Sequence, residues 1–212
     1  EAKDITNADG GTLYIRTDDD KLKFEIMRTD SLKIALGGTT GKPIAFPPLA
    51  MFDPQTGEAN HRNVATHAAV AGTSINIPDA YEAEDFDFAG TRKFDAGTGY
   101  RSKSFLTVPL KNSQNNVIGV LQLINARDRA TGEVIPFSAE IQPVIEALAS
   151  QAAVALDVSQ LLAAQKKLLD AFIELIAGAI DAKSAYTGGH CQRVPELTKM
   201  LARAACEASD GP

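Results

Sequence analysis

The segment from Ser138 to Ala182 has the apolar spacing of one long helix, and no other feature restricts the fold as strongly. A single heptad register fits its whole length. One seam position is occupied by Ile145, Ala152, Ser159, Lys166, Ile173 and Ile180, and the other by Ile141, Leu148, Ala155, Leu162, Leu169 and Ile176. Such a helix is about 60 to 70 Å long. Because a small domain cannot cover that length, the pattern predicts a homodimer that forms through helix 138–182.

The two halves of this helix have different expected partners. The first half, Ile141 to Leu156, is expected to pack on a sheet of its own chain. Ser159 and Lys166 occupy consecutive seam positions, where polar side chains weaken a coiled coil. A weak middle allows two helix packings of similar energy, which the relay of a signal requires.

Short strand patterns separated by turn residues precede the long helix. A helix is predicted from Asn63 to Ala71, with Gly72 at its C-terminal end. The proline-containing segment 44–52 is predicted to be an edge strand with a loop, and the acidic, aromatic segment 81–100 has no period, which is typical of a binding loop or lid. The predicted strands lie at 11–16, 22–27, 74–77, 105–110 and 117–125. This arrangement indicates an α+β fold with a mostly antiparallel sheet.

The charge and the cysteines argue against several classes of protein. The formal net charge is -6, and Lys and Arg form no cluster with interleaved aromatic residues, so we expect no nucleic-acid partner. Cys191 and Cys206 do not make a disulfide framework and indicate a reducing, cytoplasmic location. No continuous apolar run reaches the roughly 18 residues that span a bilayer, so we expect no membrane contact.

Four segments of the first part resemble the sequence motifs of GAF domains, in the same order along the chain. They are residues 8–14, 76–81, 98–109 and 119–125. The resemblance covers residues 1–160 and implies a GAF-like (PAS-like) domain, in which helices flank a central antiparallel sheet. It also implies a regulatory sensory role with a small molecule as ligand.

The candidate ligand site consists of polar residues in and after the segment 81–100. These residues are Asp79, Tyr81, Asp95, Thr98, Tyr100, Arg101, Ser102 and Lys103. Arg101 and Lys103 are suited to an anionic ligand. The alternative is that they are solvated loop charges, with Arg101 paired to an aspartate such as Asp95. The nearby aromatic residues are expected in the core, namely Phe86, Phe88, Phe94 and Phe105.

The sequence departs from the motif of cyclic-nucleotide-binding GAF domains. Asn125 and Phe137 match that motif, but Ala126 stands in the place of its lysine, and Ile141 and Gln142 stand in the place of its acidic pair. The salt bridge of the motif cannot form in the usual way, which weakens the prediction of cAMP or cGMP binding.

No cofactor is predicted for this part of the chain. A bilin needs a cysteine anchor in the GAF part, and none precedes Cys191. His61 and His67 are six positions apart, do not share a helical face, and are predicted to be surface histidines.

Residues 161–182 are predicted to be a signalling linker helix, and residues 183–212 the start of a further domain. The stretch 179–194, in which two glycines precede His190, is similar to the opening of bacterial HD-GYP domains of the HD superfamily. That resemblance implies a metal-dependent phosphodiesterase acting on cyclic di-GMP. It also implies divalent ions of the Fe or Mn class, with His190 as the first metal ligand.

A complete HD site also needs a His-Asp pair and further ligands. The residues from His190 to Pro212 do not supply them. We therefore expect residues 183–212 to be an incomplete and inactive part of such a phosphohydrolase.

The leading hypothesis is a GAF module that binds a small molecule and controls, through a dimeric helix, a C-terminal HD-GYP-type phosphodiesterase. The alternative is a GAF module that binds no ligand and serves dimerisation or protein interaction. A ligand-sized cavity lined by Tyr100 and Arg101 would favour the first, and closed packing of bulky side chains would favour the second.

Overall fold

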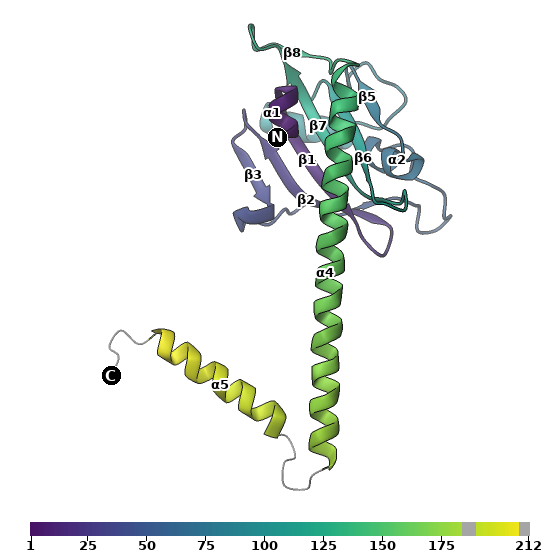
Figure 1. Ribbon diagram of the computed structural model, residues 1–212. Coiled ribbons are helices and arrows are strands. Elements are labelled where there is room, and N and C mark those ends of the chain that lie inside the picture. Colours follow the sequence, from purple (N-terminus) through teal and green to yellow (C-terminus); the bar gives the residue numbers. More distant parts are fainter. Residues whose placement is uncertain (184–189, 208–212) are drawn as a thin grey trace. The chain divides into compact units, whose positions relative to one another are not determined.

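The computed structural model describes residues 1–183 and 190–207, and the chain divides into two compact units, residues 1–157 and residues 158–212. In the first unit, the described strands form one antiparallel sheet in the order β3-β2-β1-β7-β6-β5 (Figure 1), while β4 pairs with β2 and β8 with β7. The strands are β1 (Ala8–Arg16), β2 (Lys21–Thr29), β3 (Ile34–Gly37), β4 (Leu49–Ala50), β5 (Ile75–Ile77), β6 (Phe105–Lys111), β7 (Val117–Arg127) and β8 (Val134–Ile135).

The described chain also contains helices in both units. They are α1 (Ala2–Thr6), a short 3-10 turn (Gly38–Thr40), α2 (Val64–Ala71), α3 (Ala89–Thr98), α4 (Ile141–Lys183) and α5 (His190–Glu207). The caps of α2 follow from its sequence, because the Asn63 side chain accepts the N–H groups of Ala65 and Thr66, and Gly72 has the left-handed φ of 64° that ends the helix. The predicted α+β class is confirmed.

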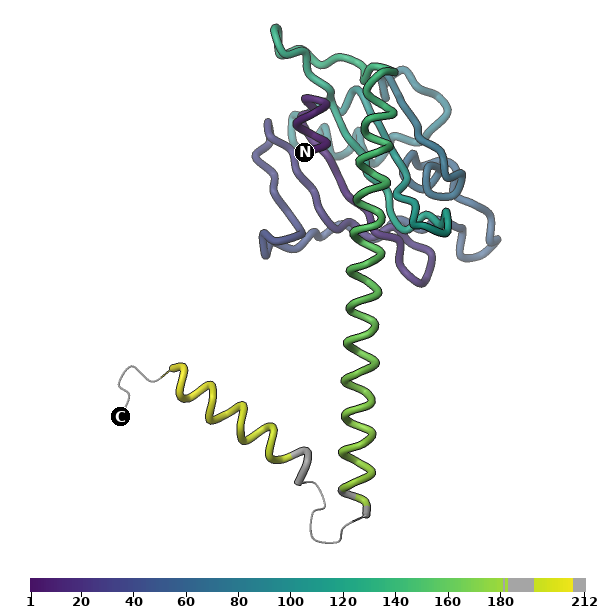
Figure 2. The backbone as a smooth tube through the Cα atoms, viewed as in Figure 1, coloured from purple at the N-terminus to yellow at the C-terminus, as the bar shows by residue number. Residues whose placement is uncertain are grey.

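The first strand of the chain pairs with the last long one. β1 lies beside β7, with Leu13 opposite Leu121 and Ile15 opposite Gly119 (Figure 2). A Cβ at Gly119 would collide with the backbone carbonyl oxygen of Tyr14, so glycine is required at this close approach. This pairing places β1 and β7 at the centre of the sheet, where both faces are covered.

One face of the sheet carries the first half of α4. Ile145, Ala149 and Ala153 are fully buried there, against a layer made of Leu106, Val108, Leu110 and Leu123. Their spacing of four residues keeps them on one side of the helix. The expectation that the segment from Ile141 to Leu156 packs on the sheet is confirmed.

The other face of the sheet carries α2 and the long connections. Ala65 and Ala69 of α2 pack on Tyr14 and Val120. Because successive side chains of a strand point to opposite faces, Gln122 faces this second layer while its neighbour Leu123 faces α4.

The segment 81–100 differs from the expected irregular loop, because it contains the ten-residue helix α3. Two aspartates explain the difference. Asp87 accepts the N–H of Ala89 at the start of the helix, and Asp95 is buried and hydrogen-bonded near its end. The helix is therefore stabilised by tertiary contacts that local propensity does not reveal.

Two further boundaries differ from expectation. α4 begins at Ile141 rather than at Ser138, although the Ser138 hydroxyl does accept the N–H of Ile141 at 3.3 Å. The expected edge strand in 44–52 is reduced to β4, two residues that pair with the start of β2.

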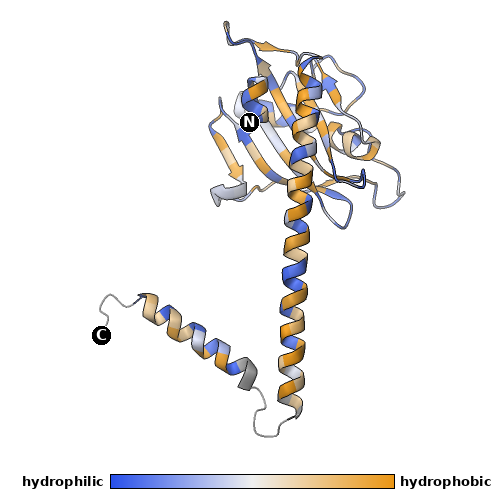
Figure 3. Cartoon of the chain, viewed as in Figure 1, coloured by the Kyte–Doolittle hydropathy of each residue, from blue (hydrophilic) through white to orange (hydrophobic). Residues whose placement is uncertain are grey.

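In the second unit, α4 exposes two rows of large apolar side chains, and such residues recur along the whole helix (Figure 3). One row follows the predicted seam and consists of Leu162, Leu169, Ile173, Ile176 and Ile180, each more than half exposed. The other row is offset by one residue and consists of Val158, Leu161, Leu168, Phe172 and Leu175. The single predicted heptad register therefore accounts for only one of the two rows.

Among the helices of the described chain, α4 is long and apolar enough, from Ile141 to Ile180, to cross a membrane by length and composition alone. The sequence analysis found no membrane-spanning segment because it considered only continuous apolar runs. The segment from Ile141 to Ile180 has interspersed polar residues. Within this segment, Ile145, Ala149 and Ala153 are buried against the sheet, so its first turns belong to a protein core.

Candidate functional site

A cavity of about 250 Å³ lies on the α2 face of the sheet. Strands β1, β2, β6 and β7 supply its floor, and α3 and the connections around α2 supply its walls. The residues that line it are Thr12, Tyr14, Phe24, Met27, Thr29, Phe46, Leu49, Asn63, Val64, Asp87, Phe88, Gly90, Thr91, Phe94, Tyr100, Ser102, Phe105, Gln122 and Ile124. This volume is slightly below the usual range of small-molecule sites, so it suits a small ligand.

Aromatic side chains dominate the lining of this cavity. Five of the nine phenylalanines and two of the four tyrosines of the chain lie there. Their ring centroids form a continuous row: 4.7 Å separates Tyr14 from Phe24, 5.5 Å separates Phe24 from Phe46, and 6.4 Å separates Phe46 from Phe94. Pairs at these distances attract each other beyond simple burial.

Asp95 joins α3 to the strand entry that follows it. Its carboxylate accepts three hydrogen bonds, from the Tyr81 hydroxyl at 2.7 Å and from the backbone N–H and the hydroxyl of Ser102, both at 2.8 Å. Asp95 is only 3% exposed, so these bonds stabilise an otherwise costly buried charge. Through these bonds, α3 in the wall of the cavity is attached to Ser102, which precedes β6.

Asp9 performs a similar role behind Tyr100. Its carboxylate accepts hydrogen bonds from the hydroxyls of Tyr100 and Ser31, both at 2.6 Å, and lies 2.8 Å from the Arg127 guanidinium. Burial opposes the ionisation of Asp9, but the hydrogen bonds from Ser31 and Tyr100 and the charge of Arg127 together hold its pKa below the ordinary value of 3.8. Burial and the bond to Asp9 raise the pKa of Tyr100 well above 10.0, so its hydroxyl stays neutral.

The lowered pKa of Asp9 predicts a loss of stability in acid. The ionised carboxylate contributes stability that is fully present above 3.8, the unfolded value, and is lost as the pH falls through the lower folded value. We expect Asp9→Asn to be less stable than the wild type at neutral pH and to approach it as the pH falls below 3.8 through the lower folded value. Urea unfolding midpoints measured across this range test the expectation, and a constant difference between the two proteins would contradict it.

Asn125 fixes the entry of β6. Its side-chain oxygen accepts the N–H groups of Lys103 at 2.7 Å and Ser104 at 3.2 Å, and its amide donates to the carbonyl oxygen of Arg101 at 2.8 Å. Asn125 also has a left-handed φ of 57°, which asparagine tolerates better than most residues. Here the asparagine of the motif therefore shapes the polypeptide next to the cavity and does not line it.

The eight candidate ligand residues do not converge on one point. Tyr100 and Ser102 line the cavity, while Thr98 is exposed at the end of α3. The guanidinium of Arg101 lies 4.4 Å from the centre of the Tyr81 ring. The remaining residues form the Asp95 contacts already described and an ion pair between Lys103 and Asp79 at 3.6 Å.

Sequence reasoning missed most of the lining. Phe88, Phe94 and Phe105 were expected in the core, and all three line the cavity, although Phe88 and Phe105 are also buried. His61 and His67 were expected at the surface; His61 is exposed and His67 partly exposed, and their rings lie 4.8 Å apart at an edge-to-face angle. The aromatic lining and the histidine pair both depend on the tertiary arrangement of the loops, so no local sequence pattern predicts them.

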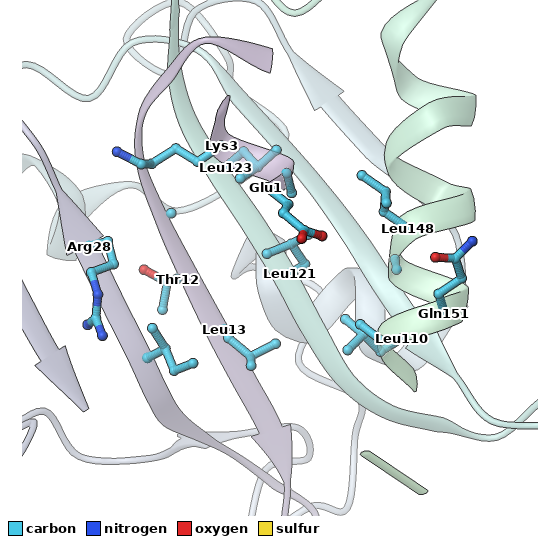
Figure 4. A pocket seen from close by; sticks show the side chains of 15 residues that line it. Glu1, Lys3, Thr12, Leu13, Arg28, Leu110, Leu121, Leu123, Leu148 and Gln151 are labelled. Carbon is cyan, nitrogen blue, oxygen red and sulfur yellow. The ribbon is translucent and has the colours of Figure 1, made fainter. Parts of the chain in front are cut away.

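A second cavity of about 470 Å³ lies on the other face of the sheet, beside α1 and the first half of α4 (Figure 4). Leu13 and Leu148 are among the aliphatic side chains that line it, and Glu1, Lys3 and Arg28 are its charged residues. Polar atoms form a small part of its lining. It therefore offers a small molecule little to fix its orientation.

Within residues 1–183 and 190–207, no three His, Cys, Asp or Glu side chains are close enough to hold a metal ion. His190 is the first residue of α5, but its side chain lies outside the described set, as do the two glycines before it. The predicted metal role of His190 therefore stays a prediction.

Comparison with known proteins gives one family. The model of the GAF domain family matches residues 1–156. The chain is 47% identical over 62 residues to the dual 3',5'-cyclic-AMP and -GMP phosphodiesterase 11 of Drosophila melanogaster. This match covers 29% of this chain and 4% of the relative. It is 33% identical over 109 residues to the dual 3',5'-cyclic-AMP and -GMP phosphodiesterase 11A of Takifugu rubripes. This match covers 51% of this chain and 11% of the relative. The matched stretches thus span a small part of these relatives.

Solved structures agree on the fold. The GAF domain of a phosphoenolpyruvate-protein phosphotransferase from Coxiella burnetii superposes with a TM-score of 0.53 at 16% identity, covering 76% of this chain and 79% of that one. At this identity the similarity establishes the architecture and not the ligand.

Proposed function

Since this chain belongs to the GAF domain family, we propose that it is a regulatory sensory module that binds a small molecule in the aromatic cavity and passes the signal on through α4. One observation carries the proposal: the cavity and α4 lie on opposite faces of the same strands. On β7, Gln122 lines the cavity and Leu123 packs in the layer beneath Ile145. A ligand that shifts the strand therefore acts on the helix packing directly.

A signal passes only if a ligand binds two arrangements of the protein with different affinities. We propose that the two arrangements are alternative packings of α4 in a homodimer. The exposed apolar rows on residues 158–183 support this, because a second copy is the partner that a heptad spacing fits. The two offset rows give the helix two surfaces of similar character for that contact.

Ligand binding is tested by native mass spectrometry of the purified protein and by thermal-shift screening. A ligand at about a hundred times its dissociation constant stabilises the folded state by about 2.7 kcal/mol, which raises the melting temperature of a chain of this size by about 8 °C. We expect Thr91→Trp, which places a bulky side chain in the lining of the cavity, to abolish the shift, and Thr98→Trp, on the exposed end of the same helix, to retain it. No co-purified compound and no shift with any compound would favour the module that only dimerises.

A second candidate ligand class is the cyclic nucleotides. The names of the two relatives favour it, since both act on cAMP and cGMP. The substitutions at Ala126, Ile141 and Gln142 count against it, because they remove the salt bridge of the cyclic-nucleotide motif. Thermal shift with cAMP and cGMP tests this candidate directly.

We further propose that the module controls an HD-GYP-type phosphodiesterase for cyclic di-GMP in a bacterial, cytoplasmic protein. The support is the sequence stretch 179–194. The described residues do not by themselves form a site for the expected Fe or Mn ions, so the metal would depend on His190 together with ligands beyond this chain. Hydrolysis of cyclic di-GMP by the longer protein, measured with and without the GAF ligand, tests this step.

A further inference from the structure

We infer that the cavity takes an uncharged, planar aromatic ligand of one or two rings, and not a nucleotide or another anion. The inference rests on the proposed sensory function, because it specifies the ligand of the same cavity. Four properties of the lining carry it: the absence of cations, the carboxylates behind its walls, the aromatic surface, and the neutral polar groups of its floor.

The cavity has no positive charge for an anion. Within the described residues, no Lys, Arg or His belongs to its lining. Arg101 and Lys103, which flank Ser102 of the lining in the sequence, are engaged elsewhere, with Arg101 on the Tyr81 ring and Lys103 beside Asp79. A phosphate that entered would lose its water without gaining a counter-charge, which is strongly unfavourable.

The walls instead have negative charges behind them. Asp9 lies behind Tyr100 and Asp95 behind Ser102, and both carboxylates are at most 3% exposed. The one charged residue of the described lining, the exposed Asp87, is also acidic. Its carboxylate already accepts the N–H of Ala89 at 2.8 Å and lies 4.0 Å from the Arg62 guanidinium. Asp9 and Asp87 each have an arginine partner and Asp95 is held by hydrogen bonds, so none of these carboxylates is free to bind a cation, and none of them attracts an anion.

The aromatic walls match a flat apolar ring. Tyr14, Phe24, Phe46 and Phe94 form a continuous row along one part of the lining, and Phe88 and Phe105 pair at 5.6 Å in another. Phe46 is 44% exposed, which is unusual for a phenylalanine in contact with two others. A planar ligand in offset contact with Phe46 would remove this ring from water.

Apart from Asp87, the polar groups of the lining are neutral. Burial raises the pKa of Tyr14 well above its ordinary value, so its hydroxyl remains protonated and donates to the Gln122 side-chain oxygen at 3.3 Å. The Gln122 amide donates to Thr107 at 3.1 Å. Among the described residues, no hydrogen bond involves the hydroxyls of Thr29 and Thr91. These groups suit a carbonyl, hydroxyl or amide on the ligand.

The test uses three probes of one shape and three charges: benzamide, benzoate and benzamidine. Binding to the intact chain is measured by ligand-observed NMR at neutral pH, together with the pair adenosine and cAMP. We expect benzamide to bind at least about tenfold more tightly than either charged probe, and adenosine to bind more tightly than cAMP.

Two matched variants locate the binding and its cause. Thr91→Lys places a cation in the lining, and we expect it to raise benzoate binding about tenfold or more. Thr98→Lys adds the same charge to the exposed end of the same helix and is expected to leave the probe order unchanged. Both positions are at least partly exposed on α3, so neither substitution disturbs a buried contact.

Two results would overturn the inference and are distinguishable from each other. Benzoate, benzamidine or cAMP binding as tightly as its neutral counterpart, with sensitivity to Thr91→Lys, would exclude the neutral class and leave the sensory function intact. Binding of none of the probes at millimolar concentration, with no ligand in the thermal-shift screen, would overturn both proposals.

Discussion

Leu169→Glu is expected to convert the proposed dimer into single chains. Leu169 lies in the predicted seam and is 58% exposed in the single chain. In a parallel dimer the substitution removes one buried leucine from each copy, about 4 kcal/mol in total, and adds two like charges in contact. The dissociation constant should therefore rise at least about a thousandfold. Sedimentation equilibrium at tens of micromolar measures the change.

The matched controls separate a seam from general hydrophobicity. Ala164→Glu introduces the same charge on the side of the helix opposite the predicted seam, beside the offset row, and should leave the dimer intact if the seam alone makes the contact. Leu168→Glu changes a residue of the offset row with 59% exposure. If Leu168→Glu dissociates the dimer as strongly as Leu169→Glu, both rows take part in the contact. A dimer that survives Leu169→Glu would contradict the predicted seam, and a wild-type protein that is monomeric at these concentrations would remove the dimeric relay.

Asp95→Ala is expected to destabilise the first unit by about 3 kcal/mol, because three hydrogen bonds to a buried carboxylate are lost and the two donors of Ser102 stay buried. For a chain of this size, that corresponds to a fall of about 9 °C in melting temperature. Since Asp95 anchors α3, which carries Thr91 and Phe94 into the lining, the variant should also bind the cavity ligand more weakly.

Two further variants serve as references for the expected loss of stability. Asp95→Asn keeps the size of the side chain and one acceptor oxygen, so its loss of stability should be intermediate. Asp85→Ala removes an exposed aspartate from the preceding loop and should change the stability by less than about 0.5 kcal/mol. Equal melting temperatures for Asp95→Ala and Asp85→Ala, measured by calorimetry, would show that the Asp95 contacts do not hold α3.

Much of the fold could be predicted from the sequence, because the signals that define it are local. The caps of α2 are set by Asn63 and Gly72, which act within one turn of the helix. The long strands β6 and β7 follow from runs of β-branched and aliphatic residues, and α4 follows from a heptad spacing. The motif residue Asn125 was identified, but its role at the entry of β6 became visible only from its three hydrogen bonds.

Short edge elements were missed for a physical reason. β3 and β8 have four and two residues and depend on pairing with β2 and β7, respectively. Helix α3 contains Gly90 and Gly97, which lower its intrinsic propensity. It forms because Asp95 and Phe94 find partners that lie elsewhere in the chain.

The long helix with its apolar rows, the α+β class and the family motifs are therefore properties of the sequence alone, because periodicity and capping are read within a few turns. The tertiary structure decided the character of the site. In the folded chain, Arg101 contacts the Tyr81 ring and Lys103 pairs with Asp79. Aromatic rings from strands and loops line one cavity. Sheet register and loop closure bring distant residues together, and for that reason we propose a neutral ligand where the sequence suggested an anionic one.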